Sequence, residues 1–110
     1  MKREIIYTDV FTSQLDLLIN YLSDFNDEVA VIDRVEEFVE RFEKVVELDP
    51  LAAPISQSLI ELGITRYREF NADGLRLVYS FDREIVNVFL IAQQKQDLEK
   101  LLVDYCLIYK

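Results

Sequence analysis

The turn sequence Asn-Ala-Asp-Gly at residues 71–74 constrains the fold most, because segments of alternating apolar and polar residues flank it on both sides. Asn at the first position and Gly at the fourth predict a type I turn closed by a left-handed glycine, which makes a three-residue hairpin loop. The length of a hairpin loop fixes the pairing of its strands. The expected pairs are Asn71 opposite Leu75, Phe70 near Arg76, and Arg68 near Val78.

This register places three basic side chains on one face of the hairpin. Side chains alternate between the two faces of a strand, so Arg66, Arg68 and Arg76 are expected to share one exposed cationic surface. Glu69 is then expected on the core side. The other residues of the core face are Tyr67, Leu75, Leu77, Tyr79 and Phe81. A shift of the register by one residue would undo this grouping.

Hydrophobic periodicity predicts the other elements. Residues 3–8 are expected to form a short strand and residues 10–25 a helix. A second helix begins at Asn26 or Asp27 and ends near Leu48. A connector at 49–62 contains a helical turn near 56–62. The remaining elements are strands at 64–70, 75–81 and 85–92 and a last helix at 96–107.

This order of elements predicts an α+β domain of the type β-α-α-β-β-β-α, with an antiparallel sheet and a helical hairpin packed on one face. On the strand at 85–92, Asn87, Phe89 and Ile91 are expected on the arginine face, together with Gln93 just after the strand. The sequence has 110 residues, is 51% hydrophobic and contains only 2 Gly and 2 Pro. This composition argues against disorder, so residues 1–110 are expected to form a single domain.

Several kinds of site are excluded by composition. The chain contains no histidine, which removes the commonest general base and the commonest metal ligand. Its acidic residues lie along helices without a ligand-spaced cluster, so we predict no metal site and no cofactor. Cys106 stands alone and is expected to be a buried, inert thiol. Without a membrane-length apolar run, or a signal-peptide pattern in residues 1–20, the chain is expected to be soluble and cytoplasmic, without membrane association.

The negative charge is concentrated in the first part of the chain. The formal net charge is −9, and residues 1–62 alone hold 14 acidic and 5 basic side chains, while residues 63–110 hold 7 of each. General electrostatic attraction to nucleic acid needs a cationic surface. The overall charge therefore argues against that mode of binding, although it leaves room for a local cationic site on the arginine hairpin.

Two short motifs resemble those of a known family. Residues 75–79, Leu-Arg-Leu-Val-Tyr, resemble the "yR-x-x-Y" strand of the RelE/ParE toxins of bacterial type II toxin–antitoxin systems, which include plasmid stabilisation proteins. Residues 92–98, Ala-Gln-Gln-Lys-Gln-Asp-Leu, resemble the family's "H-x-R/K-x-D" ending. Together with the order of elements, the resemblance covers the whole chain. It implies a toxin that is neutralised by a cognate antitoxin, whose C-terminal segment wraps the toxin, in a dimer or heterotetramer.

The two branches of this family differ in activity. RelE-like members cut mRNA on the ribosome with basic side chains and a C-terminal Tyr or His, whereas ParE-like members lack that set and inhibit DNA gyrase. In this chain Gln93 occupies the position of the usual His, and Leu98 stands where RelE-like members have Tyr. Glutamine cannot exchange a proton in general acid–base catalysis. The resemblance therefore favours the ParE-like branch and a protein that is not an enzyme.

Candidate site residues follow from the arginine hairpin and the second motif. The candidates for a catalytic role are Arg66, Arg68, Arg76 and Gln93. The candidates for partner binding are Arg66, Arg68, Arg76, Gln93, Gln94, Lys95 and Asp97. The alternative interpretation is that the arginines are solvated or paired within the molecule, and that residues 93–97 form a strand exit and a helix cap.

The sequence and the family resemblance leave three functions open. They are a ParE-like toxin that binds DNA gyrase, a RelE-like nuclease that acts on the ribosome, and a non-toxic interaction domain of the same fold. An exposed strand edge beside the helical hairpin would suit capture of an antitoxin by strand addition or in a groove. The tyrosines, which are Tyr7, Tyr21, Tyr67, Tyr79, Tyr105 and Tyr109, are expected to pack in the core or at interfaces with hydroxyls that reach water.

Overall fold

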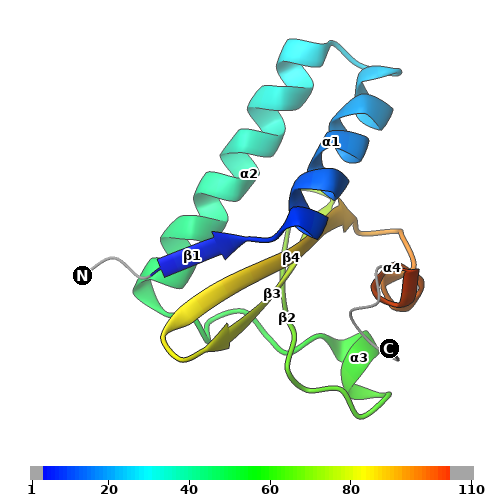
Figure 1. Cartoon of the computed structure of the whole chain (residues 1–110). Coiled ribbons are helices and arrows are strands. Elements are labelled where there is room, and N and C mark those ends of the chain that lie inside the picture. Colours follow the sequence, from blue (N-terminus) through cyan, green and yellow to red (C-terminus); the bar gives the residue numbers. More distant parts are fainter. Residues whose placement is uncertain (1–3, 105–110) are drawn as a thin grey trace.

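A four-stranded sheet forms the centre of the fold, and a pair of long antiparallel helices covers one of its faces (Figure 1). The computed structural model describes residues 4–104, apart from the side chain of Leu98. The predicted α+β class and order of elements are confirmed, and so is the helical turn expected in the connector. The elements are β1 (Glu4–Tyr7), α1 (Asp9–Ser23), α2 (Glu28–Leu48), α3 (Gln57–Ile60), β2 (Arg68–Ala72), β3 (Leu75–Asp82), β4 (Ile85–Gln93) and α4 (Leu98–Asp104).

Side-chain caps define where the two long helices begin. The Thr8 hydroxyl accepts a hydrogen bond from the backbone N–H of Phe11 at 3.2 Å, and it donates to the Val88 carbonyl at 2.9 Å. The Asp27 carboxylate accepts from the N–H of Ala30 at 3.0 Å, so Asp27 rather than Asn26 caps α2. Such caps satisfy backbone donors that have no partner within the helix.

The main core lies between the helical hairpin and the sheet. Its helix residues recur at helical spacing on one face, as the periodicity predicts. Phe42 is fully buried, and its ring lies 5.2 Å from the ring of Tyr79 on β3 in an edge-to-face arrangement. The buried members of this core are Phe11, Leu18, Leu22, Val31, Val35, Phe38, Phe42, Val46, Ala53, Leu75, Leu77, Tyr79, Val86, Val88 and Ile91.

The sheet is mixed rather than purely antiparallel. Its strand order is β1-β4-β3-β2, and β1 runs parallel to β4, with Tyr7 opposite Val88. The other neighbours pair antiparallel, as predicted. The alternation of a four-residue strand reveals which face is buried, but it carries no information on strand direction, so the antiparallel prediction for β1 was wrong.

The β2–β3 hairpin has a two-residue turn in place of the predicted three-residue loop. Asp73 and Gly74 both have positive φ angles, 54° and 77°, which is the pattern of a type I′ turn. Ala72 therefore pairs with Leu75, and Asn71 pairs with Arg76 instead of Leu75. This turn matches the right-handed twist of the strands. The predicted register was wrong by one residue.

A bulge in β4 changes the faces of the last strand. Val78 pairs with Leu90, whereas the next residue, Tyr79, pairs with Val88, so Phe89 is an extra residue in β4. Ile91 consequently lies in the main core, and Phe89 packs against the opposite face. The prediction that Asn87, Phe89, Ile91 and Gln93 share the arginine face was therefore wrong.

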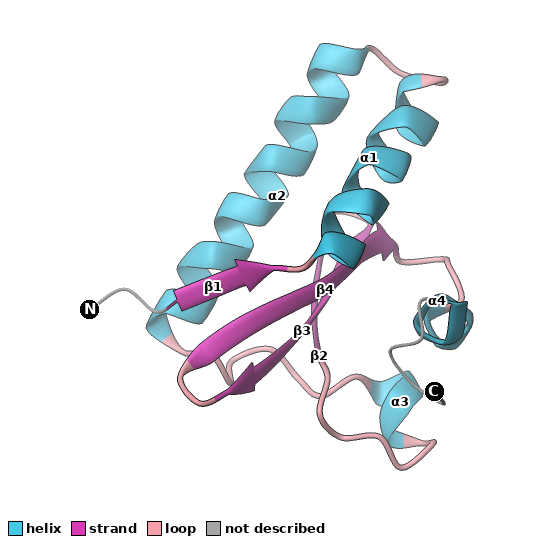
Figure 2. Ribbon diagram, in the orientation of Figure 1, coloured by secondary structure: helices cyan, strands magenta, loops and turns pink. Residues whose placement is uncertain are grey.

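The second face of the sheet is also covered, by α3 and α4 (Figure 2). A smaller cluster joins these helices to the sheet, and its buried residues are Leu59, Tyr67, Val78, Leu90 and Leu102. The connector pairs with the outer edge of β2 through hydrogen bonds from Glu69 N–H to the Pro54 carbonyl and from Ser56 N–H to the Tyr67 carbonyl. The expected open arginine face is not observed.

Some predictions fall on the C-terminal end of the chain, and another concerns membrane association. Cys106, Tyr105, Tyr109 and the end of the predicted last helix lie outside the described residues. Within residues 4–104, no helix combines the length and apolar character needed to cross a bilayer.

Candidate functional site

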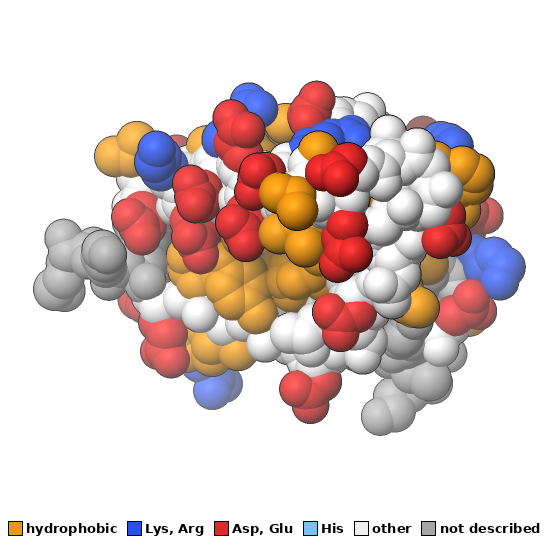
Figure 3. All heavy atoms as spheres, turned by 90° about the horizontal axis from the view of Figure 1, so that it is seen from above, with side chains coloured by type: hydrophobic (Ala, Val, Ile, Leu, Met, Phe, Trp, Pro, Cys, Tyr) orange, Lys and Arg blue, Asp and Glu red, His pale blue; other side chains and the backbone are white. Residues whose placement is uncertain are grey.

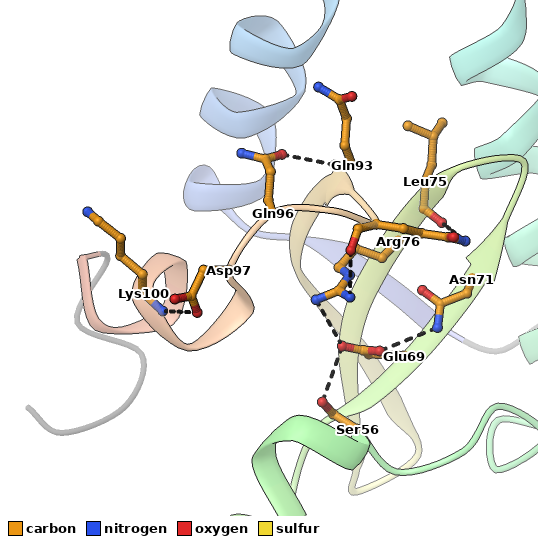
Figure 4. A network of polar contacts seen from close by, with 10 residues as sticks. Ser56, Glu69, Asn71, Leu75, Arg76, Gln93, Gln96, Asp97 and Lys100 are labelled. Atoms are coloured by element: carbon orange, nitrogen blue, oxygen red, sulfur yellow. Dashed lines mark hydrogen bonds and ion pairs between the residues drawn. The ribbon is translucent and has the colours of Figure 1, made fainter.

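Arg76 lies at the centre of a polar cluster on the sheet face that α3 and α4 cover (Figure 4). One of its terminal guanidinium nitrogens, Nη1, lies 3.6 Å from Glu69 Oε1, and the other, Nη2, donates to the Gln94 carbonyl at 2.9 Å. The two side chains are only 15% and 10% exposed. Arg76 is therefore held by partners within the molecule, as the alternative interpretation of the arginines expects.

Glu69 shares this face with Arg76, contrary to the prediction that it faces the main core. The one-residue change of register is the cause, because it moves every β2 side chain to the other face relative to β3. The Glu69 carboxylate accepts hydrogen bonds from the Ser56 hydroxyl at 3.2 Å and from the Asn71 amide at 3.3 Å. With Arg76, these contacts give a buried carboxylate three partners, which offsets much of its desolvation cost.

Arg68 lies on the opposite face of β2, next to Tyr79 of the main core. Its guanidinium donates to the carbonyls of Ala53 at 2.7 Å and Leu51 at 3.2 Å. The Tyr79 hydroxyl donates to the Pro50 carbonyl at 2.8 Å, and burial raises the pKa of Tyr79. Arg68 thus holds the connector against the sheet and is not available to a ligand on the Arg76 face.

Arg66 precedes β2 and is exposed. Its guanidinium lies over the ring of Tyr67, 4.8 Å from the ring centroid, in a cation–π arrangement. Arg66, Arg68 and Arg76 therefore occupy three separate environments. The prediction of one cationic face was wrong because the register and the start of β2 both differ from the expected ones.

Residues 93–97 form a strand exit and a helix cap. Gln93 pairs with Leu75 and points toward α1, away from Arg76 (Figure 4). The Asp97 carboxylate accepts from the N–H of Lys100 at 3.1 Å, which caps α4. The Gln94 amide donates to the Leu75 carbonyl at 3.3 Å. Lys95 is exposed beside α1. The predicted site residues are thus divided: the Gln94 carbonyl contacts Arg76 and Asp97 lines the hollow beside it, whereas Gln93 and Lys95 lie beside α1.

A shallow hollow of about 320 Å³ opens beside Arg76. Arg76 is its one basic lining residue, whereas Glu61, Asp97 and Glu99 contribute three carboxylates. Carboxylates at the mouth of a site repel phosphate groups. Within residues 4–104, no cluster of Asp, Glu or Cys has the geometry to hold a metal ion that could reverse this charge.

A larger hollow of about 440 Å³ lies on the helical hairpin, and none of its lining residues was among the predicted site residues. We call it the acidic groove. Its apolar floor is formed by Tyr7, Leu15, Ile19, Ile32 and Val39, and its rim carries Glu36, Glu40 and Glu43. Figure 3 shows apolar side chains gathered between acidic ones on this side of the molecule. The available signal was the set of apolar residues on both helices that lie outside the sheet-facing stripe.

Tyr7, the last residue of β1, lines the acidic groove. Its hydroxyl donates a hydrogen bond to Glu43 Oε2. Burial raises the pKa of Tyr7 well above its usual value, and the contact with Glu43 raises it further. Tyr7 and Tyr79 pack as expected, but their hydroxyls bind protein atoms, whereas Tyr21 is exposed on α1.

No protein-family model matches the sequence, and no curated protein matches it either. Among solved structures, the fold is similar to that of a chain in the toxin–antitoxin complex RelBE2 from Mycobacterium tuberculosis. The TM-score is 0.52 at 16% sequence identity, and the match covers 86% of this chain and 100% of the other. This chain has a RelE-like fold. The expected architecture is confirmed, while the choice between the RelE-like and ParE-like branches stays a prediction.

Proposed function

We propose that this chain is the toxin component of a type II toxin–antitoxin system, acting in the cytoplasm and neutralised by a cognate antitoxin. The proposal is supported by the RelE-like fold, since the similar chain comes from a toxin–antitoxin complex and the match covers 86% of this one. The "yR-x-x-Y" resemblance of residues 75–79 points the same way. A dimer or heterotetramer with the antitoxin is the expected assembly.

We further propose that the toxin acts by binding a protein target, DNA gyrase, and not by cutting mRNA. The observation that carries this choice is the separation of the basic residues: Arg68 and Arg76 lie on opposite faces of the sheet, and Glu69 already pairs with Arg76. RNA cleavage needs a base, an acid and stabilisation of charge on the phosphate. Here Gln93 points away from Arg76, and carboxylates surround the adjacent hollow.

Growth of a bacterial host tests the toxin assignment. The chain is induced alone, and then together with the short reading frame that neighbours it in its genome. Growth arrest that the neighbour relieves is the expected result. Normal growth in both cases, with soluble folded protein present, would instead favour the non-toxic interaction domain.

Two assays on purified protein then separate the targets. Inhibition of DNA supercoiling by gyrase is expected, and cleavage of mRNA on purified ribosomes is not. Cleavage that disappears with Arg76→Ala, while Lys100→Ala retains it, would overturn the ParE-like choice and establish the RelE-like alternative. Lys100 is a suitable control because its exposed ammonium pairs with Asp104 on α4, outside the hollow beside Arg76.

A further inference from the structure

The acidic groove combines an apolar floor with a regular row of negative charge. Glu36, Glu40 and Glu43 are spaced by four and three residues, so they lie along one side of α2. The floor residues come from β1, α1 and α2 and are partly exposed. None of the eleven lining residues is Lys or Arg. An occupant of this groove therefore meets apolar surface and one sign of charge.

The shape of the acidic groove suits a helix. It lies between two antiparallel helices, and Tyr7 of the edge strand β1 also lines it. Side chains of a third helix can pack into such a groove by the same ridge-and-groove geometry that packs helix pairs. The lining on α2 extends from Ile32 to Glu43, which corresponds to about 17 Å, or three helical turns.

The charge of the rim selects among the candidate occupants. A second copy of this chain would bring two rows of glutamates together, and each copy carries a net charge of −9. Nucleic acid would be repelled for the same reason. An uncharged apolar ligand would take Glu36 and Glu40 out of water without supplying partners, which costs free energy. A segment with Lys or Arg beside its apolar face supplies those partners and covers the floor.

We propose that the acidic groove binds a cationic amphipathic helix of about three turns from a partner protein. This inference deepens the proposed function, because under that function the segment belongs to the antitoxin. The binding chemistry itself depends only on the groove. Leucine-type side chains fill the space over Leu15, Ile19 and Val39, while Lys or Arg side chains pair with Glu36 and Glu40.

The test uses the full chain and two synthetic helical peptides of about 14 residues, a length that spans the groove. Both carry Leu at three- and four-residue spacing; one has Lys at the flanking positions and the other has Glu. Binding is measured by calorimetry, and its location by NMR chemical-shift mapping. The Lys peptide is expected to bind with shifts centred on Leu15, Ile19 and Val39, and to weaken as salt rises. The Glu peptide is expected not to bind.

Matched variants separate the groove from the overall charge. Glu36→Lys with Glu40→Lys is expected to weaken binding of the Lys peptide about tenfold or more, and to permit binding of the Glu peptide. Glu37→Lys with Glu61→Lys changes the net charge equally at exposed sites outside the groove, and should change affinity by less than about twofold. All four positions are exposed, so folding should be retained.

Three outcomes would overturn the proposal. They are equal loss of affinity in the two double variants, shifts that map to the α3 and α4 face, and self-association of the chain through the groove. The growth assay reports separately on the proposed function. Peptide binding with normal growth would keep the groove and reject the toxin, while arrest without peptide binding would do the reverse.

Discussion

The two faces of the sheet are built in different ways. The face under α1 and α2 is a continuous apolar core in which the rings of Phe38, Phe42, Phe70 and Tyr79 contact one another in series. The face under α3 and α4 has a smaller apolar cluster beside the polar network of Ser56, Glu69, Asn71 and Arg76. We expect the first face to contribute more to stability because its apolar cluster is larger, and the second to fix the position of short elements through directional contacts.

Truncation in the first face is expected to have the largest effect. Phe42→Ala removes a fully buried ring and should lower the free energy of unfolding by about 3–5 kcal/mol, because a cavity remains where the ring packed. Urea unfolding followed by circular dichroism measures the change. Phe25→Ala is the control, since that ring is 72% exposed. A similar decrease in the free energy of unfolding for Phe25→Ala would show that burial in the first face does not determine the effect.

Truncation in the second face should act locally. Leu102→Ala removes the buried anchor of α4 and is expected to cost about 2 kcal/mol, the lower end for a buried leucine, since a seven-residue helix can adjust around the gap. Hydrogen exchange should show faster opening of α4 with little change in α1 and α2. Equal loss of protection in all helices would show that the two faces unfold as one unit.

The polar network gives a double-mutant test. Glu69→Ala leaves the Arg76 guanidinium largely buried without its carboxylate, and should cost about 1–3 kcal/mol. Glu69→Ala combined with Arg76→Leu should restore part of that loss, because no charge is then left unpaired. Urea unfolding of both variants and of Arg76→Leu alone completes the cycle. Strictly additive losses would show that the pair is not coupled.

The smallest expected effect concerns Tyr7 and is pH-dependent. The folded protein keeps the Tyr7 hydroxyl protonated because its pKa is raised above the ordinary value of 10.0. The unfolded chain ionises near pH 10, so this contribution to stability is present below that pH and is lost as the pH rises further. Tyr7→Phe should cost about 1 kcal/mol at pH 7 through the lost hydrogen bond to Glu43.

The same variant should also make stability fall less steeply above pH 10. Urea unfolding between pH 7 and 11 measures this, and Tyr21→Phe, at an exposed tyrosine, is the control. If stability falls equally steeply above pH 10 in Tyr7→Phe and in the original chain, Tyr7 is not the group with the raised pKa that destabilises the fold at alkaline pH.

The helices were predictable because their apolar spacing and their caps are local features of the sequence. The faces on which the side chains of β2, β3 and β4 lie were not predictable. Asn71 followed by Gly74 fits a three-residue loop, whereas Asp73-Gly74 fits a type I′ turn, and both readings agree with the local sequence. In the folded chain, Arg34 of α2 donates to the carboxylate and the carbonyl of Asp73. This contact comes from 39 residues away, so a local pattern cannot contain it.

The candidate site depended on that register and therefore shared its error. Arg76 was expected to share an exposed face with Arg66 and Arg68, and its partner Glu69 was assigned to the other face. The bulge at Phe89 was equally hidden, because residues 88–92 are all apolar and show no alternation that a bulge could interrupt. The acidic groove became visible only when two helices were placed side by side.

The parallel pairing of β1 with β4 sets an order for biosynthesis. Thr8 and Val88, which are hydrogen-bonded at this junction, are separated by 80 residues. A ribosome must therefore translate as far as β4 before the first strand finds its neighbour, and contacts of such long range form slowly. Until then, α1 and α2 can emerge and pair while the edge beneath them stays open. A chain that stops before β4 cannot complete its sheet, so premature termination should yield protein without a finished fold.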